Sequence, residues 1–224
     1  MDLSLNTVIV FDLDDTLYKE INFLKSGYAR IALEIKKQIC KDVHDEMLNL
    51  YYNKEPVFDK IKSKYSLSMS IEEMVNLYRY HKPNINLSKG VIEILNLLRN
   101  NKIKLGLITD GRSITQRNKI EALGLIDFFN EVIISEEVQS EKPNLRNYTL
   151  LENKIEGENY IYIADNFNKD FISPNFLNWI TIGIIDDGDN IHKTNLNLAK
   201  EYYPQFKFEN FCELKDWFIK KKII

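Results

Sequence analysis

The chain has 224 residues, of which 44% are hydrophobic and 28% are charged, and its formal net charge is −3. This length suffices for one sizeable core, or for a core with a small inserted domain, and the charge provides no basic field for nucleic acid or a membrane surface. Because no apolar run reaches about eighteen residues and Met1 to Ser4 lack the regions of a signal peptide, we expect a cytoplasmic protein without nucleic-acid or membrane partners. The two cysteines, Cys40 and Cys212, are too few for a disulfide framework, match no metal-ligand spacing, and are expected to be buried or half-buried thiols.

The first predicted element is a strand over residues 7–11, because the continuous apolar sequence TVIVF is typical of a fully buried parallel strand. It is followed at once by Asp12, Asp14 and Asp15, three carboxylates within four residues. Carboxylates beside a buried strand are costly unless a cation accompanies them. This segment is therefore the first indication of a site, although Asp15 also belongs to a residue type that commonly bonds locally within a turn.

Residues 20–86 have helical periodicity. Apolar residues recur there at the spacing of one helix face, and no segment of this stretch has the pattern of a strand. The sequence therefore predicts an all-helical module, with helices over residues 24–35, 43–51, 57–65 and 71–78.

After Pro83 the sequence alternates between helices and strands. Ser88 is a good N-cap for the next helix, and Gly124 is expected to end a later helix that carries Ile114 and Ile120. Strands that alternate with helices pair in parallel, so the fold class is α/β, a doubly wound parallel sheet interrupted by the helical module. Further strands are expected over residues 104–108, 132–134, 160–163 and 179–184, and the domains over 1–18 with 87–224 for the α/β core and over 19–86 for an inserted all-helical cap.

Polar side chains follow four of the predicted strands. In open parallel sheets, ligands bind beyond the carboxyl ends of the strands, so these side chains are expected to converge on one edge. They are Asp12 and Asp14 after the first strand, Thr109, Asp110 and Gly111 after the second, Lys142 beyond the third, and Asp165 and Asp170 after the fourth.

These residue types suit phosphate chemistry. Magnesium is usually held by one or two carboxylates together with substrate phosphate and water, and Asp12 and Asp165 could supply those carboxylates. A carboxylate can attack phosphorus if a metal and a lysine, here Lys142, screen its charge. Asp14 is suitable as the general acid for the leaving alcohol and later as the base for water. Thr109 and the backbone amides around Asp110 and Gly111 could hold phosphoryl oxygens.

The same residues, in this order, resemble the motifs of the haloacid dehalogenase-like superfamily, and the match covers the whole chain. The sequence VIVFDLDDTL resembles the first motif, DxDxT. This resemblance implies that Asp12 is the nucleophile and that Asp14 is the acid/base, with its backbone carbonyl as a further metal ligand. Thr109 resembles the phosphate-binding hydroxyl of the second motif, and Lys142 before Pro143 resembles the lysine of the third.

The fourth motif is acidic, and the sequence DNFNKD matches it with Asp165 and Asp170. The resemblance implies that Asp165 is a metal ligand, whereas the spacing of the second acid varies between branches of the family. Ala164 stands where the family often has glycine. A helical cap directly after the first motif resembles the first cap class of the superfamily, which includes phosphatases, nucleotidases and β-phosphoglucomutase.

The resemblance implies a magnesium-dependent phosphatase that hydrolyses a small-molecule phosphomonoester through an aspartyl-phosphate. The stretch ADNFNKDFISPNFLNW resembles phosphatases found near polysaccharide-building enzymes, which favours a sugar, polyol or amino-alcohol phosphate from small-metabolite or polysaccharide-precursor metabolism. Alternatives are a phosphomutase of the β-phosphoglucomutase type, a nucleotide monophosphate phosphatase and a non-catalytic phosphate-binding module. Family dehalogenases lack an acid at the position of Asp14, which argues against that activity. We expect a monomer or a homodimer.

Three further residues are possible members of the site. Arg112 either reaches toward the substrate or is a residue at the start of a helix with no role in the site. Tyr18 lies where the chain leaves the core for the cap. Asp170 is the third. The three histidines have no metal-ligand pairing and are interpreted as incidental; they are His44, His81 and His192.

Overall fold

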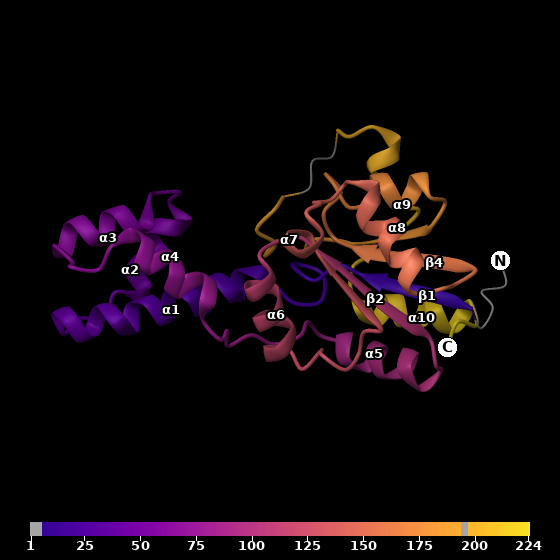
Figure 1. The fold of residues 1–224 in the computed structure, drawn as a ribbon, viewed down its shortest axis with the longest axis horizontal. Coiled ribbons are helices and arrows are strands. Elements are labelled where there is room, and N and C mark those ends of the chain that lie inside the picture. Colours follow the sequence, from indigo (N-terminus) through magenta and orange to yellow (C-terminus); the bar gives the residue numbers. More distant parts are fainter. Residues whose placement is uncertain (1–5, 194–196) are drawn as a thin grey trace.

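A six-stranded parallel sheet forms the centre of the larger part of the molecule (Figure 1). The computed structural model describes residues 6–193 and 197–224, so the N-terminal segment in which no signal peptide was expected lies outside the described residues. In spatial order the strands are β3 (Glu131–Ile134), β2 (Lys104–Thr109), β1 (Thr7–Phe11), β4 (Asn159–Ala164), β5 (Ile180–Ile184) and β6 (Phe206–Phe208).

Both faces of the sheet are buried, which explains why its central strands are continuously apolar. Ile9 and Phe11 of β1 pack on one face and Val8 and Val10 on the other. Figure 1 shows the corresponding helices as two layers around the sheet. One layer contains α5 (Val91–Asn100), α6 (Ser113–Ala122) and α10 (Phe211–Lys220), and the other contains α8 (Leu145–Lys154) and α9 (Ile172–Phe176).

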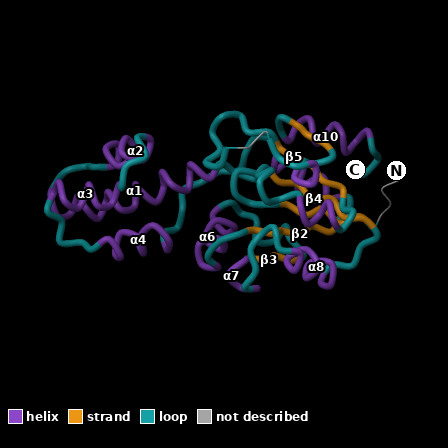
Figure 2. Tube along the Cα trace, turned by 90° about the horizontal axis from the view of Figure 1, so that it is seen from above, coloured by secondary structure: helices purple, strands orange, loops and turns teal. Residues whose placement is uncertain are grey.

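Four helices between β1 and α5 form a separate body at the edge where the strands end (Figures 1 and 2). They bury an apolar cluster of their own, centred on Ile31, Ile35 and Met47, and Tyr78 packs against both this cluster and one of the core. The predicted all-helical cap is confirmed as an architecture, and its boundaries at 18/19 and 86/87 stay a prediction. The helices are α1 (Glu20–Ile39), α2 (His44–Tyr52), α3 (Val57–Tyr65) and α4 (Ile71–Tyr80).

Some local predictions were wrong. The helix expected to be capped by Ser88 begins at Val91 after Gly90, whose φ of 85° is left-handed. Both cysteines are exposed. The short strand β6 was missed because its side chains are mostly exposed at the sheet edge, so it has no buried-strand pattern. Gly124 does end its helix in the left-handed region, with a φ of 68°.

The strand order places the site. It runs outward from β1 in one direction to β3 and in the other direction to β6, so the crevice expected at the reversal lies between β1 and β4. Asp12 and Asp165 directly follow these two strands. The remaining elements are the short helix α7 (Ser135–Val138) and a 3-10 turn (Lys200–Tyr202). Among the described residues, no helix has both the length and the apolar character needed to cross a membrane.

Candidate active site

Asp12 lies at the end of β1 with its carboxylate held from both sides. Its backbone N–H donates to the carbonyl of Ile163 on β4, at 2.9 Å. Nζ of Lys142 donates to Oδ1 at 2.5 Å, and the Thr16 hydroxyl donates to Oδ2 at 3.2 Å. Burial raises the pKa of Asp12 to about 7, with Lys142 opposing this rise and Asp170 adding to it.

Lys142 is the cation of this cluster and is itself buried. Besides Asp12, its ammonium lies 2.7 Å from Oδ1 of Asp170 and donates to the Tyr162 hydroxyl at 3.3 Å. Burial alone would lower the pKa of Lys142, but the charges of Asp12 and Asp170 raise it well above its usual value. The lysine is therefore a fixed positive charge that lies between the carboxylates of Asp12 and Asp170.

Asp165, at the end of β4, completes an acidic cluster. Its carboxylate accepts a hydrogen bond from the Asn190 side chain at 2.8 Å. It also lies 3.2 Å from the Thr16 hydroxyl, whose single proton it shares with Asp12. Oxygens of Asp12, Asp165 and Asp170 all lie within 4.8 Å of one another. Burial raises the pKa of Asp165 well above its usual value, and the charges of Asp12 and Asp170 raise it further. One lysine does not neutralise three such carboxylates, so the cluster favours a cation.

Asp14 is only two residues from Asp12 but has different partners. Its Oδ1 accepts hydrogen bonds from the Tyr18 hydroxyl and, at 2.7 Å, from Nζ of Lys119. Its Oδ2 accepts from the Gln116 side chain at 2.8 Å. Burial alone would raise the pKa of Asp14, but the Lys119 charge and these hydrogen bonds outweigh it and lower the pKa below its usual value. The pKa of Asp12 is therefore raised and that of Asp14 lowered, so the two neighbouring aspartates lie in separate electrostatic environments.

The segment after β2 contributes Thr109 and Asp110. The Thr109 hydroxyl oxygen accepts a hydrogen bond from Gln116 at 2.6 Å, so its own proton is available to a phosphoryl oxygen. The Asp110 carboxylate accepts from the backbone N–H of Lys142 at 3.0 Å and from Nζ of Lys169 at 2.7 Å. Asp110 therefore braces the segment that carries Lys142.

A cavity of about 110 Å³ joins these groups. Pockets for drug-sized ligands are several-fold larger, about 300–1,000 Å³, so this cavity suits a phosphoryl group and an ion. A larger depression of about 570 Å³ between α1 and α4 has none of the predicted site residues in its wall. The small cavity is lined by Asp12, Asp14, Asp15, Glu20, Thr109, Asp110, Lys142, Asp165, Asn166, Lys169, Asp170 and His192.

Comparison with known proteins gives the family. The model of the haloacid dehalogenase-like hydrolases matches residues 9–183. The chain belongs to this family. Among curated relatives of this hydrolase, a glyceraldehyde 3-phosphate phosphatase of Methanocaldococcus jannaschii is 30% identical over 194 residues, covering 79% of this chain and 84% of that protein. The pyrimidine 5'-nucleotidase YjjG of Escherichia coli is 46% identical over 55 residues, covering 25% of this chain and 24% of that protein.

Solved structures share the fold of this hydrolase. A haloacid dehalogenase-like phosphatase from Thermococcus onnurineus has a TM-score of 0.62 at 18% identity and covers 94% of this chain and 97% of its own. The hydrolase YfnB from Bacillus subtilis, described as bound to magnesium and as revealing interdomain movement, has a TM-score of 0.65 at 17% identity with the same coverage. At these identities the likeness establishes the α/β core and its helical insertion.

Seven of the predicted site residues line the cavity of this hydrolase, and three do not. Gly111 and Arg112 border a separate depression, where Arg112 lies 3.6 Å from Glu136. Tyr18 is buried and contacts Asp14 without lining the cavity. The seven that gather are Asp12, Asp14, Thr109, Asp110, Lys142, Asp165 and Asp170.

Other residues at the site were not predicted from the sequence of the hydrolase. His192, interpreted as incidental, lines the cavity. Asp15 is buried and bonds beyond its own turn, because its carboxylate accepts from the backbone N–H groups of Glu20 at 2.8 Å and of Ile191 at 2.9 Å. Gln116 and Lys119 are polar residues on the inner face of α6, while Ile114 is 43% exposed, and no motif in the sequence marks them.

Proposed function

We propose that this hydrolase is a magnesium-dependent phosphatase that cleaves a small-molecule phosphomonoester through an aspartyl-phosphate on Asp12. The observation that carries the proposal is the division of contacts between two neighbouring aspartates. Asp12 contacts the buried ammonium of Lys142, and Asp14 contacts a separate set of donors. A nucleophile and an acid/base need such separate environments.

The residues present fit a magnesium ion. Magnesium prefers hard oxygen ligands, and Asp12 and Asp165 offer carboxylate oxygens close together at the switch point of the sheet. The backbone carbonyl of Asp14 is the third protein ligand in this proposal. Asp170 shares its oxygen with Lys142 and is assigned to holding that lysine. When bound, the ion supplies positive charge that screens the attacking carboxylate from the phosphate.

The chain's own residues then account for both half-reactions. Lys142 and the Thr109 hydroxyl hold the phosphoryl oxygens while a carboxylate oxygen of Asp12 attacks phosphorus. The bond from phosphorus to the leaving oxygen breaks, and Asp14 gives that oxygen a proton. Asp14 next takes a proton from water, whose oxygen attacks the same phosphorus. The bond to Asp12 breaks, and inorganic phosphate leaves.

The leaving group extends toward the helical module. Glu20, the first residue of α1, lines the cavity, and burial together with the charge of Asp14 raises its pKa to about 7. A carboxyl group at this position suits hydroxyls of a sugar, polyol or amino-alcohol phosphate, and the M. jannaschii relative is named for a three-carbon phosphate. The nucleotidase relative supports a pyrimidine nucleoside monophosphate as the second candidate.

Phosphate release from a panel of phosphomonoesters tests the reaction class. The panel contains an aryl phosphate, sugar and polyol phosphates, amino-alcohol phosphates and nucleotides, each with magnesium and with a chelator. We expect magnesium-dependent release that is highest for one small phosphate ester, because the cap limits the leaving group. Isomerised sugar phosphates without free phosphate would instead indicate a mutase. No release and no isomer with any member would contradict the proposal.

Magnesium binding tests the metal site independently of turnover. At a hundredfold excess over its Kd, bound magnesium should raise the Tm by about 5–10 °C at pH 8. Since the pKa of Asp12 is raised to about 7, protons occupy the site at pH 5 and must be displaced, so the shift should be much smaller there. Differential scanning fluorimetry measures both.

The matched variants are Asp165→Asn, which should abolish the magnesium shift, and Asp45→Asn, which should keep it. The side chain of Asp45 is 99% exposed on α2. An unchanged shift in Asp165→Asn would remove that residue from the metal site.

A further inference from the structure

We propose that Lys119 and Gln116 of α6 are positioning residues for Asp14, and that they hold its carboxyl group in line with the leaving oxygen. The inference rests on the proposed function, because it assigns to two side chains the task of orienting the acid/base of that reaction. Neither residue belongs to the motifs that the sequence analysis identified, and neither lines the small cavity.

Both oxygens of Asp14 are held from the same helix. Lys119 donates to Oδ1 at 2.7 Å and Gln116 donates to Oδ2 at 2.8 Å. The two residues are three positions apart, so they occupy one face of α6. With these donors on both oxygens, and the Tyr18 hydroxyl as a second donor to Oδ1, the carboxyl group cannot rotate without losing a contact.

The burial of this pair needs a reason. The Lys119 side chain is 3% exposed and Gln116 is 1% exposed, and a buried lysine is costly unless it is paired. The ammonium of Lys119 lies 4.5 Å from the ring centre of Phe23, and Asp14 is the carboxylate that pairs with it at 2.7 Å. A helix that only covered the sheet would not need these groups.

Gly111 provides independent evidence. Its φ is 136°, and a Cβ there would lie 3.2 Å from Cδ of Gln116. The absence of a side chain at this position leaves room for the Gln116 amide, which also donates to Thr109 at 2.6 Å. One glutamine therefore sets the orientation of both the acid/base and the phosphate-binding hydroxyl.

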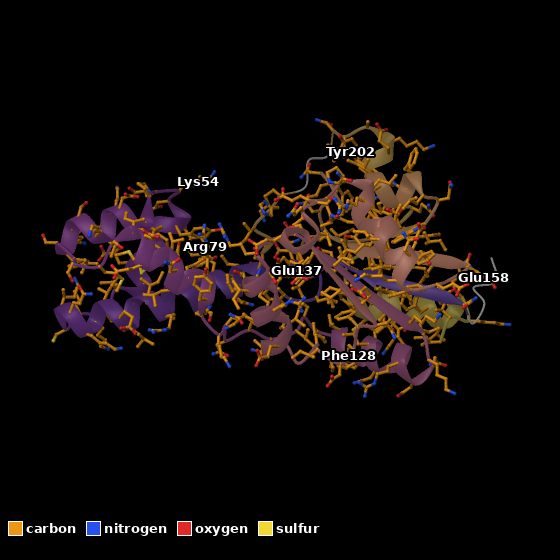
Figure 3. The ribbon with its side chains drawn as sticks, viewed as in Figure 1. Lys54, Arg79, Phe128, Glu137, Glu158 and Tyr202 are labelled. Carbon is orange, nitrogen blue, oxygen red and sulfur yellow. The ribbon has the colours of Figure 1, made fainter. Side chains whose placement is uncertain are left out.

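The outer face of α6 is held as well. Arg117 donates to both carboxylate oxygens of Glu137, at 2.7 and 2.8 Å. Figure 3 labels Glu137 at the end of the core nearest the helical module, and Arg79 on that module. This two-point contact fixes α6 on α7, so that Gln116 and Lys119 project from a rigid support.

Lys119 also faces the helical module. Its Nζ lies 3.8 Å from Oε1 of Glu20, the first residue of α1, so the same ammonium contacts the acid/base of the core and the first turn of the cap. Through this contact the position of α1 is linked to the orientation of Asp14.

Leaving-group dependence distinguishes positioning from a merely structural role. An alkyl phosphate needs a proton on its leaving oxygen, whereas a nitrophenolate leaves without one, and kcat/KM reports the step in which that bond breaks. With magnesium present, Lys119→Met should lower kcat/KM about 100-fold for alkyl phosphates and only a few-fold for nitrophenyl phosphate. Lys119→Arg should restore most of the alkyl activity. Gln116→Leu also removes the donor to Thr109, so it should lower kcat/KM for both substrates but more for the alkyl phosphates.

The control variant is Lys154→Met, which removes an exposed ion pair with Glu131 and should leave both substrates unchanged. In an Asp14→Asn background, Lys119→Met should have no further effect. If the wild type is active, an equal decrease for both substrates in Lys119→Met, or no decrease for either, would overturn the positioning role. Absence of activity from the wild type would instead contradict the proposed function.

Discussion

Replacing Asp12 by asparagine is expected to reduce phosphate release by about 10⁴-fold or more, because an amide oxygen is a poor nucleophile and cannot form the aspartyl-phosphate. The fold should persist. Lys142 keeps Asp170 as a partner at 2.7 Å, and one of three crowded buried carboxylates is removed. Steady-state phosphate release and circular dichroism measure the two effects.

A direct test of the intermediate is mass spectrometry of acid-quenched enzyme. Wild type should carry one phosphoryl group on the peptide that contains Asp12, and Asp12→Asn should carry none. Asp45→Asn is again the matched control, since it makes the same chemical change on the exposed surface of α2. An Asp12→Asn protein that releases phosphate at the wild-type rate would contradict the assignment of Asp12 as the nucleophile.

Replacing Lys142 by alanine is expected to lower kcat about 10²–10³-fold, because a buried donor to the transferring phosphoryl group is lost. Inhibition by inorganic phosphate should weaken in parallel. The same change leaves Asp12 and Asp170 buried without their cation, so the free energy of unfolding should decrease by about 3–5 kcal/mol. Steady-state kinetics and urea titration measure these effects.

The loss of stability should depend on pH. Without Lys142 the pKa of Asp12 rises beyond the value of about 7 that it has in the intact site. A carboxyl group whose pKa is raised in the folded state destabilises the protein as pH rises from the unfolded-state value toward the folded-state value. The deficit of Lys142→Ala should therefore be larger at pH 8 than at pH 5. The control is Lys154→Ala on the surface of α8, which should lose little stability at either pH. Unchanged kinetics in Lys142→Ala would remove Lys142 from the site.

Much of the site could be predicted from sequence because its residues follow strands. Asp12, Thr109 and Asp165 each come directly at or after the end of a strand whose apolar run is unmistakable, and parallel strands bring such ends to one edge. The strand β6 could not be found in this way, because its three residues are largely exposed.

Residues in helix interiors were harder to predict. Gln116 and Lys119 lie on the face of α6 that periodicity assigns to packing, and only the position of Asp14 shows that this face serves a carboxylate. Asp110 also follows a strand and was expected to bind substrate, and it lines the cavity. Its carboxylate contacts the backbone of Lys142 and the side chain of Lys169, a pairing between distant segments that no local pattern encodes.

The separate apolar cluster of α1–α4 has a consequence for how this hydrolase can diverge. Ile31, Ile35 and Met47 pack within the helical module, whereas the side chains that handle phosphate come from the ends of strands in the core. A substitution that reshapes the module therefore need not disturb the packing that aligns Asp12 with Lys142. Selection for a new leaving group can act on one body of the molecule while the chemistry is inherited in the other. Because Glu20 at the start of α1 contacts Lys119, directed evolution toward other phosphate esters should begin with libraries in α2–α4.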